Sequence, residues 1–419
     1  MKILHTADIH IGVENYGKID PETRTSTRLS DFLRSFDEIV SFAIQETVDL
    51  VIIAGDAYKS RNPSQTHQRE FAKRISKLSI NNIPVFILIG NHDSPNIPGP
   101  ATALEIFPTL DVEKVTIGDQ LSNYDISTKS GPIQIVSVPW IRKGDLSDSK
   151  ISTTQTIEEI NEEIQKTIIY KISQLVDSLD PKLPAILVGH LSTESAITSS
   201  EKSMMLSKDY LIPTQNLALP KLDYVALGHI HRHQQLNQSP RVVYSGSIER
   251  IDFGEENDTK GFCLLEIDPK KSSGQREVEF QFIPVNSRKF KTIKVKIDNQ
   301  DLQPTQTILD EITRHDIKDS IIQLIIEMSA SQSKNVFDNE IRKALSEAYL
   351  IAAVKRNIRA ETQPRLDTNF SDNISPIEVL KEYLNHRNLD DKKKNAIIDK
   401  GYDLINQINE ESLKNIFCF

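Results

Sequence analysis

Short runs of apolar residues recur along the chain, and polar residues follow each of them within a few positions. Runs of this length, bounded by glycine or polar residues, are typical of buried strands. Ligands of open α/β sheets bind beyond the carboxyl ends of the strands, so we expect these ends to meet at one crevice. The runs are Met1–Leu4, Leu50–Ala54, Val85–Ile89, Ala185–Val188 and Tyr224–Leu227.

The pattern changes near residue 285, where a first domain of residues 1–285 is expected to end. Beyond it, Ile293, Val295 and Ile297 alternate with lysines, which indicates a strand with one buried face. Strands and helices then alternate as β-α-β-α-β, which predicts a small α/β cap over residues 286–360. The expected elements are strand Phe290–Ile297, helix Thr305–Arg314, strand Ser320–Met328, helix Val336–Ala348 and strand Ile351–Ile358.

The last part of the chain has a different composition. Residues 361–374 are polar and turn-rich, which predicts a linker. Residues 375–419 then show two helical patterns, the first opened by the capping box Ser375–Glu378 with proline at its first helical position. Two short helices bury little by themselves, so we expect their apolar faces to need a partner. Alternatively, they fold back on the cap or the core.

Length and charge narrow the class of protein. A chain of 419 residues with 38% hydrophobic content is long enough for two or three domains. We expect the chain to start in a strand without a leader, and no apolar run reaches the length of a membrane span. The only cysteines are Cys263 and Cys418, which favours a reducing cytoplasm. A net charge of −9 argues against a general nucleic-acid coat but permits a local basic rim.

Polar motifs at the predicted strand ends carry the candidate chemistry. Asp8 and His10 are two residues apart on an extended segment, so both can bind one ion, and His229 and His231 repeat this spacing. Each motif alone has an ordinary explanation as a turn or a structural histidine. Together they contain five of the ten histidines, which makes coincidence implausible. The motifs are Asp8-Ile9-His10, Gly55-Asp56, Gly90-Asn91-His92-Asp93, His190 and Gly228-His229-Ile230-His231.

The donor types predict a pair of divalent metal ions. Carboxylate, amide and imidazole groups without thiolate suit manganese, iron or zinc better than a structural zinc site. Two such ions about 3.5–4 Å apart can hold a phosphate ester, activate water and neutralise the leaving oxygen. A carboxylate is the natural bridge between them, and we expect Asp56 to have this role.

The series Asp-x-His, Gly-Asp, Gly-Asn-His-Asp, His and Gly-His-x-His resembles that of the calcineurin-like metallophosphoesterase superfamily. Further stretches are similar to its branch of SbcD-like double-strand-break repair nucleases, and they all lie within residues 1–265. The resemblance implies a two-sheet α/β core, a small α/β cap and a C-terminal helical tail. The further stretches are Arg28–Ser64, Tyr244–Ser247, Phe253–Glu255 and Lys260–Phe262.

The resemblance also implies roles for the site residues. His92 would stand beside the scissile phosphate as general acid or transition-state stabiliser, with Asp93 orienting it. Alternatively, His92 is a loop histidine that only packs against the site. Asp56 would bridge the ions, with Asp8, His10 and His231 on one ion and Asn91, His190 and His229 on the other.

The function implied by the resemblance is a manganese-dependent DNA nuclease with 3'-5' double-strand exonuclease and single-strand endonuclease activity. It would work in the cytoplasm at the nucleoid, as a homodimer with an SbcC-type ATPase bound through the C-terminal helices. The chain has no phosphate-binding loop of its own, so any ATP dependence would come from that partner. Candidate DNA contacts are Lys59, Arg61 and Arg232, together with Arg142–Lys143 and Arg288–Lys296. Alternatively, Lys59 and Arg61 are only solvated, and Arg288–Lys296 is a solvated edge strand.

One position departs from archaeal and eukaryotic relatives, which tend to carry a histidine where this chain has Lys59. The departure weakens any argument that a second histidine handles the leaving strand or sets exonuclease polarity. Two other functions stay open at this point. A phosphatase or small-molecule phosphodiesterase would explain the metal motifs but leave the cap and tail without a purpose. A non-catalytic scaffold would not need the complete set of polar residues.

Overall fold

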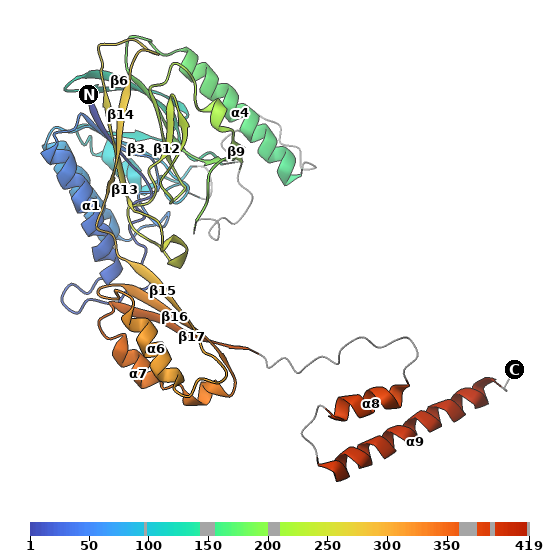
Figure 1. Cartoon of the computed structure of the whole chain (residues 1–419). Helices are drawn as coiled ribbons and strands as arrows, with labels where there is room; N and C mark the ends of the chain where they lie inside the picture. The colour runs from blue at the N-terminus through green and yellow to red at the C-terminus, as the bar shows by residue number, and fades with distance from the viewer. Residues whose placement is uncertain (96–98, 143–155, 200–209, 360–374, 386–389, 417–419) are drawn as a thin grey trace.

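The computed structural model of the chain describes residues 1–95, 99–142, 156–199, 210–359, 375–385 and 390–416. The expected linker 361–374 and Lys143 therefore lie outside the described residues. The first domain consists of two six-stranded sheets packed face to face, with helices on both outer surfaces (Figure 1). The predicted two-sheet α/β core is confirmed.

The first sheet has the order β14-β13-β1-β2-β3-β4. Its strands β1 to β4 are parallel, and β13 pairs antiparallel with β1 from far along the chain. The bounds are β1 Lys2–Thr6, β2 Leu50–Ile53, β3 Val85–Leu88, β4 Val115–Gly118, β13 Gly261–Ile267 and β14 Val278–Pro284.

The second sheet has the order β11-β12-β10-β7-β6-β5, parallel in its centre and antiparallel at both edges. A separate two-stranded pair lies beside it, β8 Ser192–Thr193 with β9 Leu211–Ile212. The sheet strands are β5 Ser122–Thr128, β6 Gly131–Val138, β7 Ala185–His190, β10 Tyr224–Gly228, β11 Gln234–Gln238 and β12 Arg241–Tyr244.

Three apolar clusters hold these layers together. One fills the space between the sheets, where Ile52 and Phe86 of the first sheet meet Ile186 and Ala226 of the second. The others lie under the outer helices of each sheet. The helices are α1 Thr27–Gln45, α2 Gln65–Ile80, α3 Ile106–Thr109 and α4 Ile157–Asp177, with short 3-10 turns at η1 Ala103–Glu105, η3 Thr214–Asn216 and η4 Phe253–Glu255.

A separate parallel sheet, β15-β16-β17, lies where the cap was expected and has its own apolar core. The alternation in β15 places Ile293 and Val295 in that core, and Lys294 and Lys296 are exposed. The helices α6 and α7 cover one face of the sheet (Figure 1). The bounds are β15 Phe290–Lys296, α6 Pro304–Thr313, β16 Ile321–Ser329, η5 Gln332–Asn335, α7 Asp338–Ala344 and β17 Leu350–Arg359.

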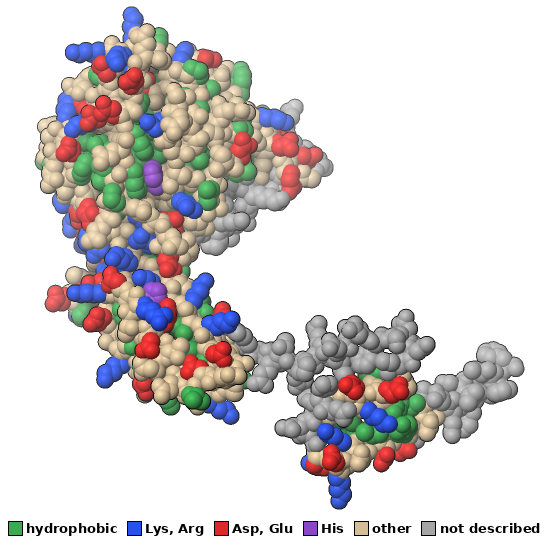
Figure 2. Space-filling view, viewed as in Figure 1, with side chains coloured by type: hydrophobic (Ala, Val, Ile, Leu, Met, Phe, Trp, Pro, Cys, Tyr) green, Lys and Arg blue, Asp and Glu red, His purple; other side chains and the backbone are tan. Residues whose placement is uncertain are grey.

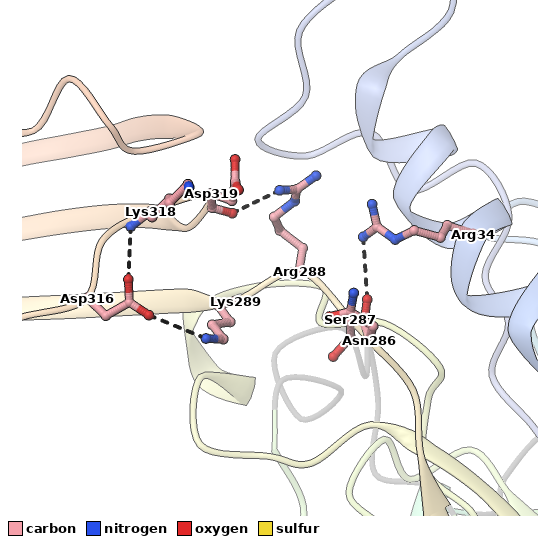
Figure 3. Close-up of a pocket in the computed structure, with 8 residues that line it drawn as sticks. All are labelled: Arg34, Asn286, Ser287, Arg288, Lys289, Asp316, Lys318 and Asp319. Atoms are coloured by element: carbon pink, nitrogen blue, oxygen red, sulfur yellow. Dashed lines mark hydrogen bonds and ion pairs between the residues drawn. The ribbon is translucent and has the colours of Figure 1, made fainter.

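A buried ion network joins the core to the cap. The Arg28 side chain is fully buried and binds Asp31 at 2.8 Å and Glu249 at 3.3 Å. Arg288, at the start of the cap, binds the same Asp31 at 2.6 Å. A pocket of about 590 Å³ opens beside this junction (Figure 3). It is lined by Arg34, Asn286, Ser287, Arg288, Lys289, Asp316, Lys318 and Asp319.

Two helices follow the cap, α8 Pro376–Asn385 and α9 Asp391–Ile416, and Figure 1 shows them beside each other and apart from the other elements. Ile377 and Leu384 of α8 are buried in this pair. Gly401 of α9 lies so close to Leu380 that an added Cβ would meet its methyl group at 2.5 Å. No described helix combines the length and the apolar content that a membrane span needs.

Candidate metal centre

The predicted strand ends converge although they belong to two sheets. β1, β2 and β3 come from the first sheet, and β7 and β10 come from the second. Backbone hydrogen bonds tie the first two motifs together, because Asp8 N donates to Gly55 O at 3.1 Å and His10 N donates to Asp56 O at 3.0 Å. The structure thereby brings all the predicted ligand residues into one cluster, in which all of them are buried except Asn91, which is partly exposed.

Strained backbone marks the ligand positions. Asp8, His10 and Asp56 have φ values of 52°, 48° and 55°, and His229 has 95°. The left-handed region is unfavourable for residues other than glycine, and such residues cluster at functional sites. Because four expected ligands share this conformation, the strain points to a site that the rest of the fold holds in place.

Asp8, His10 and His231 form the first ligand group, and all three are buried. The Nε2 atoms of His10 and His231 lie 3.0 Å apart. Glu255 accepts a hydrogen bond from His231 Nδ1 at 2.8 Å, which places the ring proton on Nδ1 and leaves Nε2 as a lone pair facing His10.

Asn91, His190 and His229 form the second group. Asn91 Oδ1 lies 2.9 Å from His190 Nε2 and 3.1 Å from His229 Nδ1. His190 Nδ1 lies 2.8 Å from the Ala54 carbonyl oxygen and can donate to it, which orients the ring. Burial by itself would lower the pKa of His190, but the charge of Asp56 raises it to about 9.

Asp56 lies between the two groups. Its Oδ2 atom is 3.7 Å from His10 Nε2 and 3.4 Å from His190 Nε2. Its Oδ1 atom accepts the backbone N–H of His92 at 2.8 Å. Burial opposes ionisation, but the charges of His190 and His92 hold the pKa of Asp56 well below its usual value. One carboxylate therefore faces both ligand groups.

His92 is half-buried at the edge of the cluster, with its ring 5.1 Å from the ring of His10. It also lies within ligand distance of His10 and Asp56, so its position alone does not separate a ligand from a group beside the substrate. Burial lowers the pKa of His92, which favours the neutral imidazole.

Asp93 has contacts that differ from those we expected. Its carboxylate accepts hydrogen bonds from the backbone N–H groups of Ala57, Tyr58 and Gly90 at 3.1–3.2 Å. In the described part of the chain, these bonds join the loops after β2 and β3, and His92 is not among the partners. The orientation of His92 by Asp93 therefore stays a prediction.

The cluster fits divalent metal ions. Facing imidazole nitrogens, carboxylates and an amide oxygen converge inside the protein, where lone pairs that face one another are unfavourable without a cation between them. Cys263 is buried elsewhere, in the core between the sheets, so the described donor set contains no thiolate. The groups Asp8-His10-His231 and Asp8-Asp56-His190 are each compact enough for one ion, which is compatible with a binuclear site.

Residues 1–233, which contain the cluster, match the calcineurin-like phosphoesterase family. The chain belongs to this family. The match spans more than half of the chain, and every predicted ligand lies within the matched residues.

Several named relatives of the family resemble this chain. The SbcD subunit of nuclease SbcCD from Staphylococcus epidermidis is 29% identical over 274 residues, which cover 64% of this chain and 66% of that protein. The SbcD subunit from Escherichia coli K12 is 27% identical over 292 residues, covering 68% and 69%. The DNA double-strand break repair protein Mre11 of Methanosarcina mazei is 26% identical over 359 residues, covering 85% and 49%. The matched region thus spans about two thirds of the bacterial relatives and about half of the archaeal one.

Two residues of the centre were missed by the sequence analysis. Glu255, which binds His231, lies in the 3-10 turn η4 rather than after one of the predicted strands, so no strand end marked it. Trp140, the single tryptophan, packs against the rings of His229 and His190 at 5.1 and 6.3 Å. It stands two residues after the end of β6, which was the one available signal.

The residues expected to contact DNA differ in their exposure and in their bonding partners. Lys59 is half-buried. Burial lowers the pKa of its ammonium group, and the charges of Asp56 and Glu255 act in the opposite direction. Arg61 is exposed, and its Nε donates to Ser94 O at 2.7 Å. Arg232 is half-exposed and lies 3.8 Å from Asp258. The guanidinium of Arg142 binds the Pro95 carbonyl oxygen.

Proposed function

We propose that this chain is a metal-dependent DNA nuclease that processes DNA ends, with manganese as its metal. The observation that carries the proposal is the convergence of one complete set of carboxylate, amide and imidazole groups around Asp56. The relatives named as nuclease subunits and break repair proteins direct it to DNA rather than to another phosphate ester.

Each ligand group would hold one ion. Asp8, His10 and His231 would bind the first and Asn91, His190 and His229 the second, with Asp56 bridging. When bound, two such ions supply Lewis-acid charge at the phosphate and an activated water. The protein contributes a rigid donor set, since the ligands are buried, hydrogen-bonded or held in strained backbone conformations.

His92 would donate a hydrogen bond or a proton at the leaving oxygen. Its backbone N–H donates to Asp56 Oδ1, which holds this loop residue at the edge of the cluster. Burial favours the neutral imidazole, which can donate a hydrogen bond through its ring N–H, whereas donation of a proton would need the imidazolium form. Lys59 would lie close enough to contact a phosphate of the bound strand.

The substrate would be duplex DNA degraded from a 3' end and single-stranded DNA cut internally. A basic rim formed by Lys59, Arg61 and Arg232 would contact phosphates beside the metal centre. The cap would guide the duplex, using the exposed lysines of β15. These contacts need only local positive charge, so they agree with a net charge of −9.

The partner would be an SbcC-type ATPase bound by α8 and α9. Ile397 and Leu404 are seven residues apart on α9, so they share one face, and they are 41% and 52% exposed. Figure 2 shows hydrophobic side chains gathered on this helical unit. We further propose a cytoplasmic homodimer, with exposed Ile80 of α2 and Leu110 after α3 in the contact surface.

Hydrolysis of end-labelled linear duplex DNA with added manganese tests the proposal. The wild-type chain should degrade DNA, and His92→Ala should lose hydrolysis while manganese content stays normal. Loss of metal in that variant would instead make His92 a ligand. A chromogenic phosphomonoester measured alongside is the control, since turnover of the monoester with intact DNA would indicate a phosphatase.

A further inference from the structure

A buried ion pair lies directly behind His231. Glu255 accepts a hydrogen bond from His231 Nδ1 at 2.8 Å with one carboxylate oxygen and binds Lys260 Nζ at 2.8 Å with the other. The side chains of Glu255 and Lys260 are both fully buried. The carboxylate therefore links a metal-binding imidazole to an ammonium group that has no access to solvent.

The ammonium group holds the same histidine a second time. Lys260 Nζ donates to the backbone carbonyl oxygen of His231 at 3.0 Å and to Ser247 Oγ at 2.9 Å. With Glu255 these partners use all three protons of the ammonium. Lys260 is thus bound to the backbone of His231 directly and to its ring through Glu255.

The surrounding backbone is built closely around this arrangement. Ile251 N donates to the second oxygen of Glu255 at 3.1 Å, and Ser247 N donates to His231 O at 3.1 Å. Gly246 has a φ of 78°, and an added Cβ would lie 2.8 Å from His231 O. The segment 246–260 therefore wraps the far side of His231 with little room for rearrangement.

A buried ion pair is not explained by stability alone. Removing two charges from water is costly, and apolar residues of similar volume often replace such a pair without loss of stability. A metal-binding histidine, in contrast, gains a fixed ring orientation and tautomer when its second nitrogen binds a carboxylate. The contacts of Glu255 and Lys260 match this second purpose.

We propose that Glu255 and Lys260 are positioning residues of the metal centre that hold His231 with Nε2 directed at the ion it shares with Asp8 and His10. The inference rests on the proposed metal-dependent function. Glu255 sets the ring, and Lys260 fixes Glu255 relative to the backbone of the same histidine. Neither residue touches the substrate.

The test measures manganese binding rather than hydrolysis. Electron paramagnetic resonance of free Mn2+ gives the number of ions per chain and their affinities without any substrate. The double variant Glu255→Leu/Lys260→Met replaces the ion pair by apolar side chains and removes both contacts with His231. We expect the chain to fold and one of two ions to bind about 10- to 100-fold more weakly, while the other keeps its affinity.

A conservative variant and a matched control separate positioning from folding. In Glu255→Gln/Lys260→Met the amide oxygen still accepts a hydrogen bond from His231 Nδ1. The Mn2+ ion that binds more weakly to the apolar variant should therefore regain most of its affinity. The Asp223–Arg276 pair, at 3.2 Å, is also buried, and Asp223 directly precedes β10, at the opposite end of that strand from His229. The control variant Asp223→Asn/Arg276→Met neutralises this pair and should bind both ions as the wild type does.

Equal affinities in wild type and Glu255→Leu/Lys260→Met would overturn the positioning role. An equal loss of manganese affinity in Asp223→Asn/Arg276→Met would also overturn it, because the loss would then reflect a less stable core. A wild-type chain that binds no manganese would overturn this inference together with the metal centre. Two bound ions without DNA hydrolysis would remove only the nuclease proposal, because the affinities of the variants decide the role of Glu255 and Lys260 by themselves.

Discussion

Gly90 follows β3 and Gly189 lies within β7, and each directly precedes an expected ligand, yet their surroundings differ. A Cβ added to Gly90 would lie 2.1 Å from Asp56 Oδ1 and 2.4 Å from Asp56 N, so alanine would displace Asp56. A Cβ added to Gly189 would meet only leucine methyl groups, at 3.1–3.4 Å. We expect Gly90→Ala to lose manganese binding and Gly189→Ala to keep it. Counting bound Mn2+ per chain checks this, and equal binding in both variants would contradict it.

The ligands were predictable because each stands directly after an apolar run. At Gly90 the structure shows a close approach of Asp56 that leaves no room for a Cβ. The partners of Asp93 were not predictable, because backbone N–H groups carry no signal in the sequence. Glu255 and Lys260 fell only within stretches that resemble the family, since their link to His231 depends on a three-dimensional contact between segments.

His5 gives a prediction about pH. It is fully buried in β1, and its Nδ1 lies 3.1 Å from the Tyr224 hydroxyl. Burial lowers the pKa of His5 from 6.5 to about 3. Between these values the unfolded chain binds a proton at His5 that the folded chain does not, so stability is lost as the pH falls through this window.

His5→Gln removes this titration and keeps a hydrogen-bonding partner for Tyr224. We expect its free energy of unfolding to depend less steeply on pH than that of the wild type, by up to about 1.4 kcal/mol per pH unit. Urea unfolding without added metal, at several pH values from neutral down to about pH 5, measures both slopes. Parallel slopes would mean that folded His5 takes up its proton normally.

At the scale of elements, the strands were predictable and their assignment to sheets was not. The apolar runs correspond to β1, β2, β3, β7 and β10, but nothing local distinguishes the sheet of β3 from the sheet of β7. The cap shows how tertiary contacts move a boundary. A helix was expected from Val336, but α7 begins at Asp338, because Val336 O accepts a hydrogen bond from Arg356 of β17 at 3.2 Å.

Strand β15 carries a prediction about DNA binding. Lys294 and Lys296 are exposed on the face opposite its buried residues. If the cap guides DNA, Lys294→Glu/Lys296→Glu should weaken duplex binding and reduce the salt dependence of the affinity by about 0.9 in log–log slope per lost phosphate contact. Fluorescence anisotropy with labelled duplex at several salt concentrations measures both quantities.

A matched pair of lysines controls for net charge. Lys270 and Lys271 follow β13, which runs antiparallel to β1, so they lie at the end of the sheet away from the metal centre. Lys270→Glu/Lys271→Glu makes the same change in charge and should leave duplex affinity near that of the wild type. Equal weakening in both variants would indicate a general electrostatic effect and remove β15 from the binding surface.

At the scale of the whole molecule, the order of core, cap and helical tail follows the changes of pattern along the sequence. The contact between core and cap could not be predicted from that pattern. Arg28 and Asp31 on α1 meet Glu249 and Arg288 from more than 200 positions further along the chain. Arg28 is fully buried, although an arginine in a helical pattern is usually expected to be exposed, so the local sequence gave no sign of this contact. The network fixes the position of the cap relative to the core, which a DNA-guiding role would require.

The helical tail gives the last prediction. Because α8 and α9 bury residues against each other and leave Ile397 and Leu404 exposed on one face, Ile397→Glu/Leu404→Glu should prevent association with an SbcC-type ATPase. Hydrolysis of short DNA by the isolated chain should be unchanged, since the metal centre lies in residues 8–255. Co-purification and a nuclease assay measure the two effects. The exposed polar positions in Asn395→Glu/Asn406→Glu receive the same added charge and should retain the partner. Association that survives in the first variant would place the ATPase contact elsewhere.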